Sequence, residues 1–76
     1  DLSVRIDGHM DDVGDPSSNR QLSEKRANAV VDWLVKAGID RGRLTAQGWG
    51  ETRPLVPNDS PENRQLNRRT ELVLLP

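Results

Sequence analysis

Apolar and polar residues alternate along the first segment of the chain, from residue 2 to residue 7. Its apolar positions are Leu2, Val4 and Ile6. A period of two is typical of a strand that turns one face toward the core and the other toward solvent. Gly8 interrupts the alternation, so we expect a half-buried first strand that ends there.

Over residues 24–37 the apolar period lengthens to about 3.6 residues. The apolar positions are Ala27, Val30, Val31, Leu34 and Val35. This spacing gathers them on one side of an amphipathic α-helix. Ser23 is placed to cap the first turn with its hydroxyl, and Gly38 is placed to end the helix in the left-handed conformation. We therefore expect a helix from Glu24 to Ala37, with Ser23 as its N-cap.

Residues 43–48 show a weaker strand pattern in which alternate positions share one face. These positions are Leu44, Ala46 and Gly48. A strand, a helix and a strand in succession make a βαβ unit, whose strands should be parallel and joined by a right-handed crossover. Residues 49–60 are rich in Gly, Pro and Asn, and they predict an extended surface loop.

The last part of the chain predicts a short helix and a final strand. Ser60 and Pro61 suit the N-cap and the first helical position, and we expect the helix to continue to about Asn67. Residues 69–75 carry apolar side chains on both faces, which is typical of a strand inside a sheet. Three strands and about one and a half helices leave part of the sheet without cover, so the fold is expected to be incomplete or completed by another chain. The chain is therefore expected either to associate, as a homo-oligomer through the exposed sheet edge, or to be only marginally stable.

The two tryptophans differ in their expected exposure. Trp33 lies at the edge of the apolar stripe of the helix, and should be buried or half-buried. Trp49 lies between two glycines in the expected loop, and should be exposed.

Composition limits the function classes open to this chain. The 76 residues make one small domain, 1–76, whose apolar fraction of 33% includes no Phe or Tyr, so its core should consist mainly of Leu, Val and Ile. A net charge of −1 argues against general nucleic-acid binding, which depends on neutralising phosphates. The absence of cysteine excludes disulfides and thiolate metal sites. No apolar run approaches the roughly 20 residues of a membrane-spanning helix, so no membrane insertion by this segment is expected.

The expected loop from Gly8 to Leu22 has fifteen residues, whereas strand-to-helix connections usually take about 2–6. A loop of this length is either disordered or built to bind something. It begins with acidic residues beside one histidine: His9, Asp11, Asp12 and Asp15. Their spacing matches neither zinc nor calcium patterns, so the favoured interpretation is acidic residues that solvate a turn, and no metal or cofactor is predicted.

No set of residues in the chain resembles a catalytic site. One His, no Cys and no serine in a nucleophile elbow indicate a binding module, not an enzyme. A basic cluster precedes the last strand and is interpreted as a solvated edge, with RNA contact less favoured because no exposed aromatic residues are expected beside it. The members of this cluster are Arg64, Asn67, Arg68 and Arg69.

Arg26 lies in the expected first turn of the helix, where the helix dipole disfavours a cation. Its side chain is expected to face the preceding loop. Two interpretations remain open: a surface arginine paired with Asp11, Asp12 or Asp15, or one pole of a site for a zwitterion. In the second, Arg26 and the amides at the helix start would hold a carboxylate, and a nearby Asp would hold an ammonium.

Four motifs occur in an order and spacing that cover nearly the whole chain. They are GHMDDVG at residues 8–14, LSEKRA at 22–27, GWGETRP at 48–54 and NRQLNRR at 63–69. With these motifs and Asn19, the chain resembles the peptidoglycan-binding domain of the outer membrane protein A family. Domains of that family normally open with a further strand and helix, so the resemblance implies that this chain starts at the second strand.

The resemblance implies an α+β fold, an α/β two-layer sandwich in which a mixed sheet carries helices on one face. It also implies noncatalytic, noncovalent binding of peptidoglycan through the diaminopimelate of the stem peptide. Such binding would anchor an envelope protein to the cell wall in the periplasm. The alternative is an interaction or assembly module that keeps the fold and is silent toward this ligand.

The resemblance also assigns ligand-binding residues. Asp11 falls on the key Asp of the family and Arg26 on its key Arg, while Asn19 and Arg69 match positions that commonly line the same pocket. Met10 replaces the usual Thr, and so removes a hydroxyl that could orient the loop or contact the ligand. The family site agrees with the zwitterion interpretation reached from the residues alone.

Overall fold

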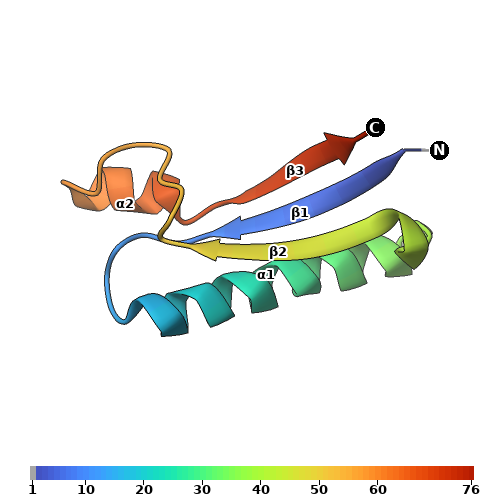
Figure 1. Ribbon diagram of the computed structural model, residues 1–76, viewed down its shortest axis with the longest axis horizontal. Coiled ribbons are helices and arrows are strands. Elements are labelled where there is room, and N and C mark those ends of the chain that lie inside the picture. The colour runs from blue at the N-terminus through green and yellow to red at the C-terminus, as the bar shows by residue number, and fades with distance from the viewer. Residues whose placement is uncertain (1) are drawn as a thin grey trace.

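The computed structural model describes residues 2–76 as an open sheet with one long helix against it and a short helix beyond the strand ends (Figure 1). In chain order the elements are β1 (Ser3–His9), α1 (Pro16–Lys36), the 3-10 helix η1 (Arg41–Arg43), β2 (Leu44–Gly50), α2 (Pro61–Asn67) and β3 (Thr70–Leu75). Both chain ends lie at the end of the sheet opposite α2.

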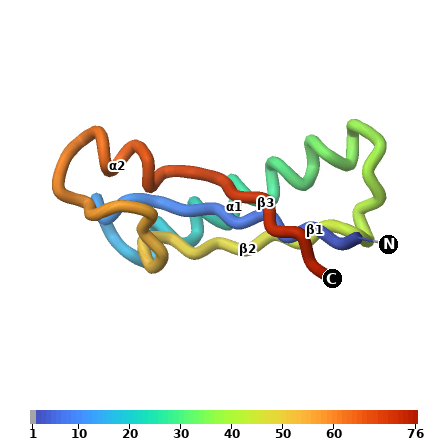
Figure 2. Tube along the Cα trace, turned by 90° about the horizontal axis from the view of Figure 1, so that it is seen from above, coloured from blue at the N-terminus to red at the C-terminus, as the bar shows by residue number. Residues whose placement is uncertain are grey.

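The three strands form a mixed sheet in the order β2-β1-β3. β1 and β2 are parallel, with Val4 opposite Leu44, and β1 and β3 are antiparallel, with Val4 opposite Leu74. Seen from above, α1 crosses the sheet obliquely (Figure 2). The expected α+β class, the parallel βαβ unit and the mixed sheet are therefore confirmed, with α1 on one face and α2 beyond the strand ends.

The start of α1 differs from the prediction. The helix begins at Pro16, whose ring suits the first helical position, and Asp15 is the N-cap because its carboxylate accepts the Ser18 N–H at 2.9 Å. The predicted cap, Ser23, lies inside the helix and is fully buried. Only residues 10–15 therefore connect β1 to α1, and the fifteen-residue loop does not exist.

The apolar periodicity did not predict the first turns of α1, residues 16–23, because the residues on their buried face are polar. Asn19 and Ser23 continue the stripe that Ala27 and Val31 begin, and all four are buried. The hydroxyl of Ser23 donates to the Arg20 carbonyl at 2.7 Å and accepts the Gly50 N–H at 3.0 Å. A hydrophobicity pattern cannot mark a helix whose first buried positions are hydrogen-bonded polar side chains.

Close packing of α1 on the strands explains the glycines of β1 and β2. A Cβ atom at Gly8 would lie 2.1 Å from the Ser23 carbonyl oxygen, and one at Gly48 would lie 2.2 Å from Cγ of Glu24. The predicted strand end at Gly8 is also wrong, because β1 continues to His9, whose N–H donates to the Arg69 carbonyl at 2.8 Å. Gly8 is present for close approach and not as a terminator.

The other helix boundaries agree with the prediction. Gly38 has a φ of 107°. Its N–H donates to the Val35 carbonyl at 3.0 Å, and the Ile39 N–H donates to the Leu34 carbonyl at 3.1 Å. These two bonds make the Schellman arrangement that ends a helix. In α2, the Ser60 hydroxyl accepts the Asn63 N–H at 3.1 Å.

The predicted exposures of the two tryptophans are wrong. Trp33 is 68% exposed, because it lies about 200° around the helix from Val31. Trp49 is half-buried because β2 continues through it to Gly50. The guanidinium carbons of Arg53 and Arg5 also lie over its ring, at 3.5 Å and 5.8 Å from the ring centroid.

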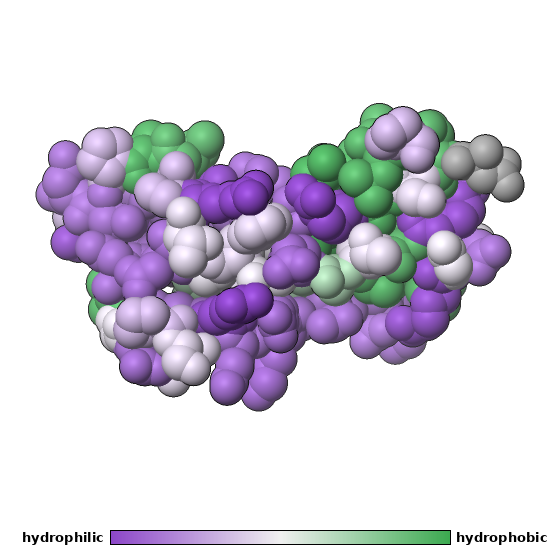
Figure 3. All heavy atoms as spheres, viewed as in Figure 1, coloured by the Kyte–Doolittle hydropathy of each residue, from purple (hydrophilic) through white to green (hydrophobic). Residues whose placement is uncertain are grey.

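β3 was predicted to lie inside the sheet, but among residues 2–76 it is an edge strand. Leu72 and Leu74 are 62% and 67% exposed. Apolar residues gather at the end of the molecule near the chain termini (Figure 3), beside a small apolar core made of Ile6, Ala27, Val31 and Leu44. The exposed edge on which the expected homo-oligomer depends is present, and the association itself stays a prediction.

Alanine at Gly8 should destabilise the fold far more than alanine at Gly42. The added methyl group at Gly8 meets helix backbone at 2.1 Å, whereas at Gly42 its nearest neighbour is an Asp40 carboxylate oxygen at 3.5 Å. Overpacking of this kind costs about 1–3 kcal/mol or more of unfolding free energy, and the exposed control should stay within about 0.5 kcal/mol. Urea unfolding of both variants measures the difference, and equal midpoints would contradict the close packing.

Acrylamide should quench Trp33 more steeply than Trp49. The variants Trp49→Phe and Trp33→Phe leave one indole each for the measurement. The neutral quencher is preferred to iodide, because Arg5 and Arg53 would concentrate an anion around Trp49 and disguise its shielding. Steeper quenching of Trp49 would mean that β2 ends before it.

Candidate functional site

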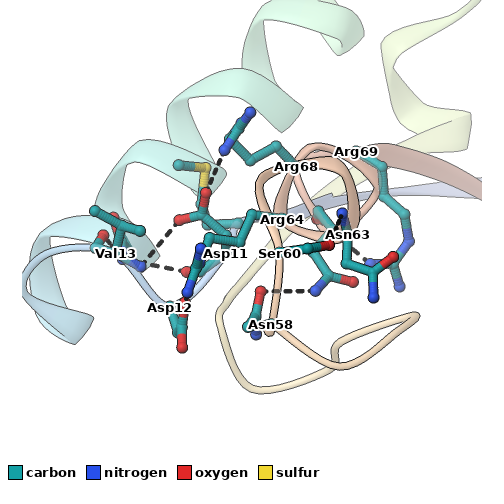
Figure 4. Close-up of polar contacts among 12 residues, drawn as sticks. Asp11, Asp12, Val13, Asn58, Ser60, Asn63, Arg64, Arg68 and Arg69 are labelled. Atoms are coloured by element: carbon teal, nitrogen blue, oxygen red, sulfur yellow. Dashed lines mark hydrogen bonds and ion pairs between the residues drawn. The ribbon is translucent and has the colours of Figure 1, made fainter.

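The candidate site lies at the end of the sheet next to α2, where residues 10–15 meet the segment between α2 and β3 (Figure 4). Side chains of both segments point toward one another across this junction. The loop contributes acids and the α2 side contributes arginines. The site therefore depends on residues that are far apart in the chain.

Asp11 is the buried acid of the junction, with 3% of its surface exposed. One carboxylate oxygen accepts the Val13 N–H at 3.0 Å, and the other accepts a hydrogen bond from the guanidinium of Arg68. Burial raises the pKa of Asp11, but the Val13 N–H and the charge and hydrogen bond of Arg68 outweigh it, so the net pKa is lowered. The carboxyl group is therefore held ionised inside the protein.

A second ion pair lies beside the first. Nε of Arg64 is 3.3 Å from a carboxylate oxygen of Asp12. The predicted solvated basic edge is therefore wrong for both arginines, because Arg64 and Arg68 bind the loop acids. Asn67, which lies between them in the sequence, is fully buried. Its side-chain oxygen accepts the N–H groups of Leu55 and Val56 at 2.8 and 3.1 Å, and its side-chain nitrogen donates to the Val56 carbonyl at 2.9 Å.

Asn19 shapes the loop from beneath. It is 8% exposed, and its amide donates to the carbonyl of Val13 at 2.8 Å and to that of Asp11 at 3.4 Å. The residue predicted to line the pocket is thus brought to Asp11 and contacts its backbone, not its carboxylate.

Arg26 reaches the same loop from the third turn of α1. Its guanidinium donates to the sulfur of Met10 at 3.4 Å and not to the carboxylates of Asp11, Asp12 or Asp15. The interpretation of Arg26 as a surface arginine paired with these acids is wrong, because Asp11 and Asp12 pair with other arginines and Asp15 caps the helix. The amides that were expected to assist Arg26 lie within the helix, so they are not free for a ligand.

Arg69 turns away from this junction. Its Nε is 2.5 Å from a carboxylate oxygen of Glu71, and another guanidinium nitrogen donates to the Arg53 carbonyl at 3.1 Å. Arg68 is the arginine that meets Asp11, and sequence reasoning missed it. The signal was the Arg68-Arg69 pair itself, because neighbouring residues in extended backbone point in opposite directions.

His9 is buried close to Arg69 and is 3% exposed. Among the residues that the structure describes, neither ring nitrogen has a hydrogen-bond partner, and Nε2 is 3.7 Å from a Glu71 carboxylate oxygen. Burial and the nearby charge of Arg69 lower its pKa, so the ring is neutral at pH 7. Within residues 2–76, no group of three or more His, Cys, Asp or Glu side chains is placed to hold a metal ion.

The sequence is similar to those of several known proteins. Residues 1–68 match the OmpA family. The chain is 49% identical to outer membrane porin F of Pseudomonas aeruginosa over 91% of its own length and 20% of the porin. It is 38% identical to peptidoglycan-binding protein ArfA of Mycobacterium tuberculosis over 97% of its length and 23% of that protein. The chain thus spans about a fifth of the length of these curated relatives.

The fold is similar to that of a solved structure. The peptidoglycan-associated lipoprotein from Burkholderia pseudomallei superimposes with a TM-score of 0.94 at 28% identity, over 97% of this chain and 63% of the other. In the part of the chain that the structure covers, no helix combines the length and apolar character needed to cross a bilayer.

Unfolding free energy should fall with acid in two separate windows. The pKa of His9 is lowered from 6.5 in the folded protein, so below about pH 6.5 the unfolded chain binds the extra proton and stability declines. The pKa of Asp11 is lowered from 3.8, so its contribution is complete above about pH 3.8 and is lost as the pH falls through the folded value.

Urea unfolding across the pH range tests both windows. His9→Asn should flatten the upper window only, and Asp11→Asn should reduce the slope of the lower one. Asp7, whose pKa is also lowered, keeps part of the lower slope in the second variant. Curves parallel to the wild type in both windows would contradict these assignments.

Proposed function

Because the chain belongs to the OmpA family, we propose that it binds peptidoglycan noncovalently and anchors a cell-envelope protein to the wall. The proposal is supported by the names of two similar proteins, a peptidoglycan-binding protein and a peptidoglycan-associated lipoprotein. Peptidoglycan lies outside the cytoplasm, so the periplasm is the proposed location. We propose binding without catalysis, since no nucleophile pairs with a base at the site.

The proposed ligand is the diaminopimelate of the stem peptide. Its side arm ends in a carbon that carries both an ammonium and a carboxylate. The ionised Asp11 would take the ammonium, and the guanidinium of Arg26 would take the carboxylate as a bidentate fork. The observation that carries this proposal is the contact of Arg26 with Met10. It brings to the residue next to Asp11 an arginine that has no carboxylate partner within residues 2–76.

We propose indirect roles for the other two candidate residues. Asn19 holds the carbonyl groups of Asp11 and Val13, and so fixes the direction of the Asp11 side chain. Arg69 binds the Arg53 carbonyl and Glu71, and so fixes the backbone that precedes β3. Both would support the site without contacting the ligand.

A second candidate function is a ligand-silent interaction or assembly module. The observation that favours it is the burial of Asp11, which is 3% exposed and already bonded to Arg68. A buried carboxylate whose charge is balanced by an arginine can have a purely structural role. Direct measurement of binding separates the two functions.

Asp11→Ala and Arg26→Ala should each weaken binding of an L-Ala-D-Glu-diaminopimelate tripeptide. A charge-assisted hydrogen bond contributes about 1.5–3 kcal/mol, so the expected loss is roughly tenfold to more than a hundredfold in Kd. Arg26→Lys should also weaken binding, since an ammonium cannot reproduce the fork. Isothermal calorimetry at pH 7 measures all three variants.

Arg41→Ala is the matched control, because Arg41 pairs with Asp32 at 2.9 Å near the far end of α1. It should bind as the wild type does. The tripeptide with lysine in place of diaminopimelate lacks the side-arm carboxylate, and should bind more weakly. Normal binding by Arg26→Lys would leave Arg26 without the proposed role, and no binding by the wild type would favour the ligand-silent module.

A further inference from the structure

We propose that Arg68 is the resident counter-ion of Asp11 and that a ligand ammonium has to displace it before it can bind. This inference rests on the proposed function, since it concerns the same acid. It adds a residue that competes with the ligand, and so sets both affinity and specificity.

The first support is the state of the Asp11 carboxylate. Its side chain is 5% exposed, one oxygen accepts the Val13 N–H, and the other accepts from Arg68. The Val13 bond belongs to the loop backbone and maintains the shape of the loop. An incoming ammonium therefore needs the oxygen that Arg68 occupies (Figure 4).

The second support is the freedom of Arg68 to leave. Its side chain is 39% exposed, in contrast to that of Asp11. Arg68 is the C-cap residue of α2, and its backbone N–H stays bonded to the Arg64 carbonyl at 3.1 Å. Within residues 2–76, Asp11 is the one polar partner of its guanidinium. The side chain can rotate into solvent while the backbone bond remains intact.

The third support is the neighbouring charge that stays behind. Arg64 binds Asp12 at 3.3 Å and also lowers the pKa of Asp11 through its charge. Arg64 therefore keeps a positive charge near Asp11 while its partner is exchanged. The exchange replaces one cation with another at a buried acid, so the charge balance of the junction is preserved.

Specificity follows from this exchange. A ligand that offers only an ammonium replaces the ion pair that Asp11 already makes with Arg68, so its net gain in binding free energy is small. A ligand that also offers a carboxylate adds the bond to Arg26, and this second bond drives the displacement. If Arg68 leaves Asp11 in about a tenth of the unliganded molecules, the apparent Kd is about ten times the intrinsic value.

Arg68→Gln tests the inference, with Arg64→Gln as the matched control from the same helix. Both variants remove one guanidinium that faces the loop, but only Arg68 covers the Asp11 carboxylate. Calorimetry at pH 7 compares the diaminopimelate and lysine tripeptides, and a cooperative urea transition checks that each variant is folded. Arg68→Lys is a second variant that keeps the charge and loses the planar fork.

Arg68→Gln should bind the diaminopimelate tripeptide about tenfold more tightly than the wild type, and it should gain measurable binding of the lysine tripeptide. Arg64→Gln should bind no more tightly than the wild type, because Arg68 still covers the Asp11 carboxylate, and Arg68→Lys should fall between the wild type and Arg68→Gln.

Two results would overturn it in different ways. If the wild type binds and Arg68→Gln binds equally or more weakly, Arg68 is not a competitor, while the proposed function stands. If neither the wild type nor any variant binds either tripeptide, the proposed function fails and the inference fails with it.

Discussion

The contact between the middle of α1 and the backbone of β1 and β2 is the constraint on which the structure depends. Ser23 has no exposed surface, and its hydroxyl holds the N–H of Gly50. Gly8 and Gly48 leave no room for a side chain beneath the helix. The axis of α1 is therefore fixed by backbone contact and a buried hydrogen bond, in a molecule whose apolar core is small. That position of α1 brings Arg26 to Met10, next to Asp11.

Much of the fold could be predicted because it depends on local rules. The apolar stripe, the Gly38 terminus and the Ser60 cap each follow from a few neighbouring residues, and each is present. The start of α1 could not be predicted from hydrophobicity, because its buried residues there are polar and are hydrogen-bonded to partners outside the helix. The site divides in the same way. Asp11 and Arg26 follow from motifs, but only the end of α2 decides that Arg68, and not Arg69, faces the acid.

The junction of the loop with α2 shows how charge is organised in a chain that is nearly neutral overall. Asp11 and Asp12 on the loop meet Arg68 and Arg64 on the α2 side, so the two segments neutralise each other. Arg26 is outside this balance and approaches a thioether. Arg26 thus lies beside an acid whose charge is already compensated by Arg68. Such an arrangement suits a ligand that carries both charges on adjacent groups.

The position of the Asp11 partner in the chain has a consequence for folding. Asp11 and Arg68 are separated by 57 residues, and β3, which follows directly, pairs with β1 from the opposite end of the chain. Contacts of such separation form late, because closing a long loop costs entropy before any contact compensates for it. The parallel pair β1–β2 and helix α1 span a shorter stretch and can assemble earlier. We therefore expect Asp11 to acquire its counter-ion after the β1–α1–β2 unit has formed, when β3 pairs with β1.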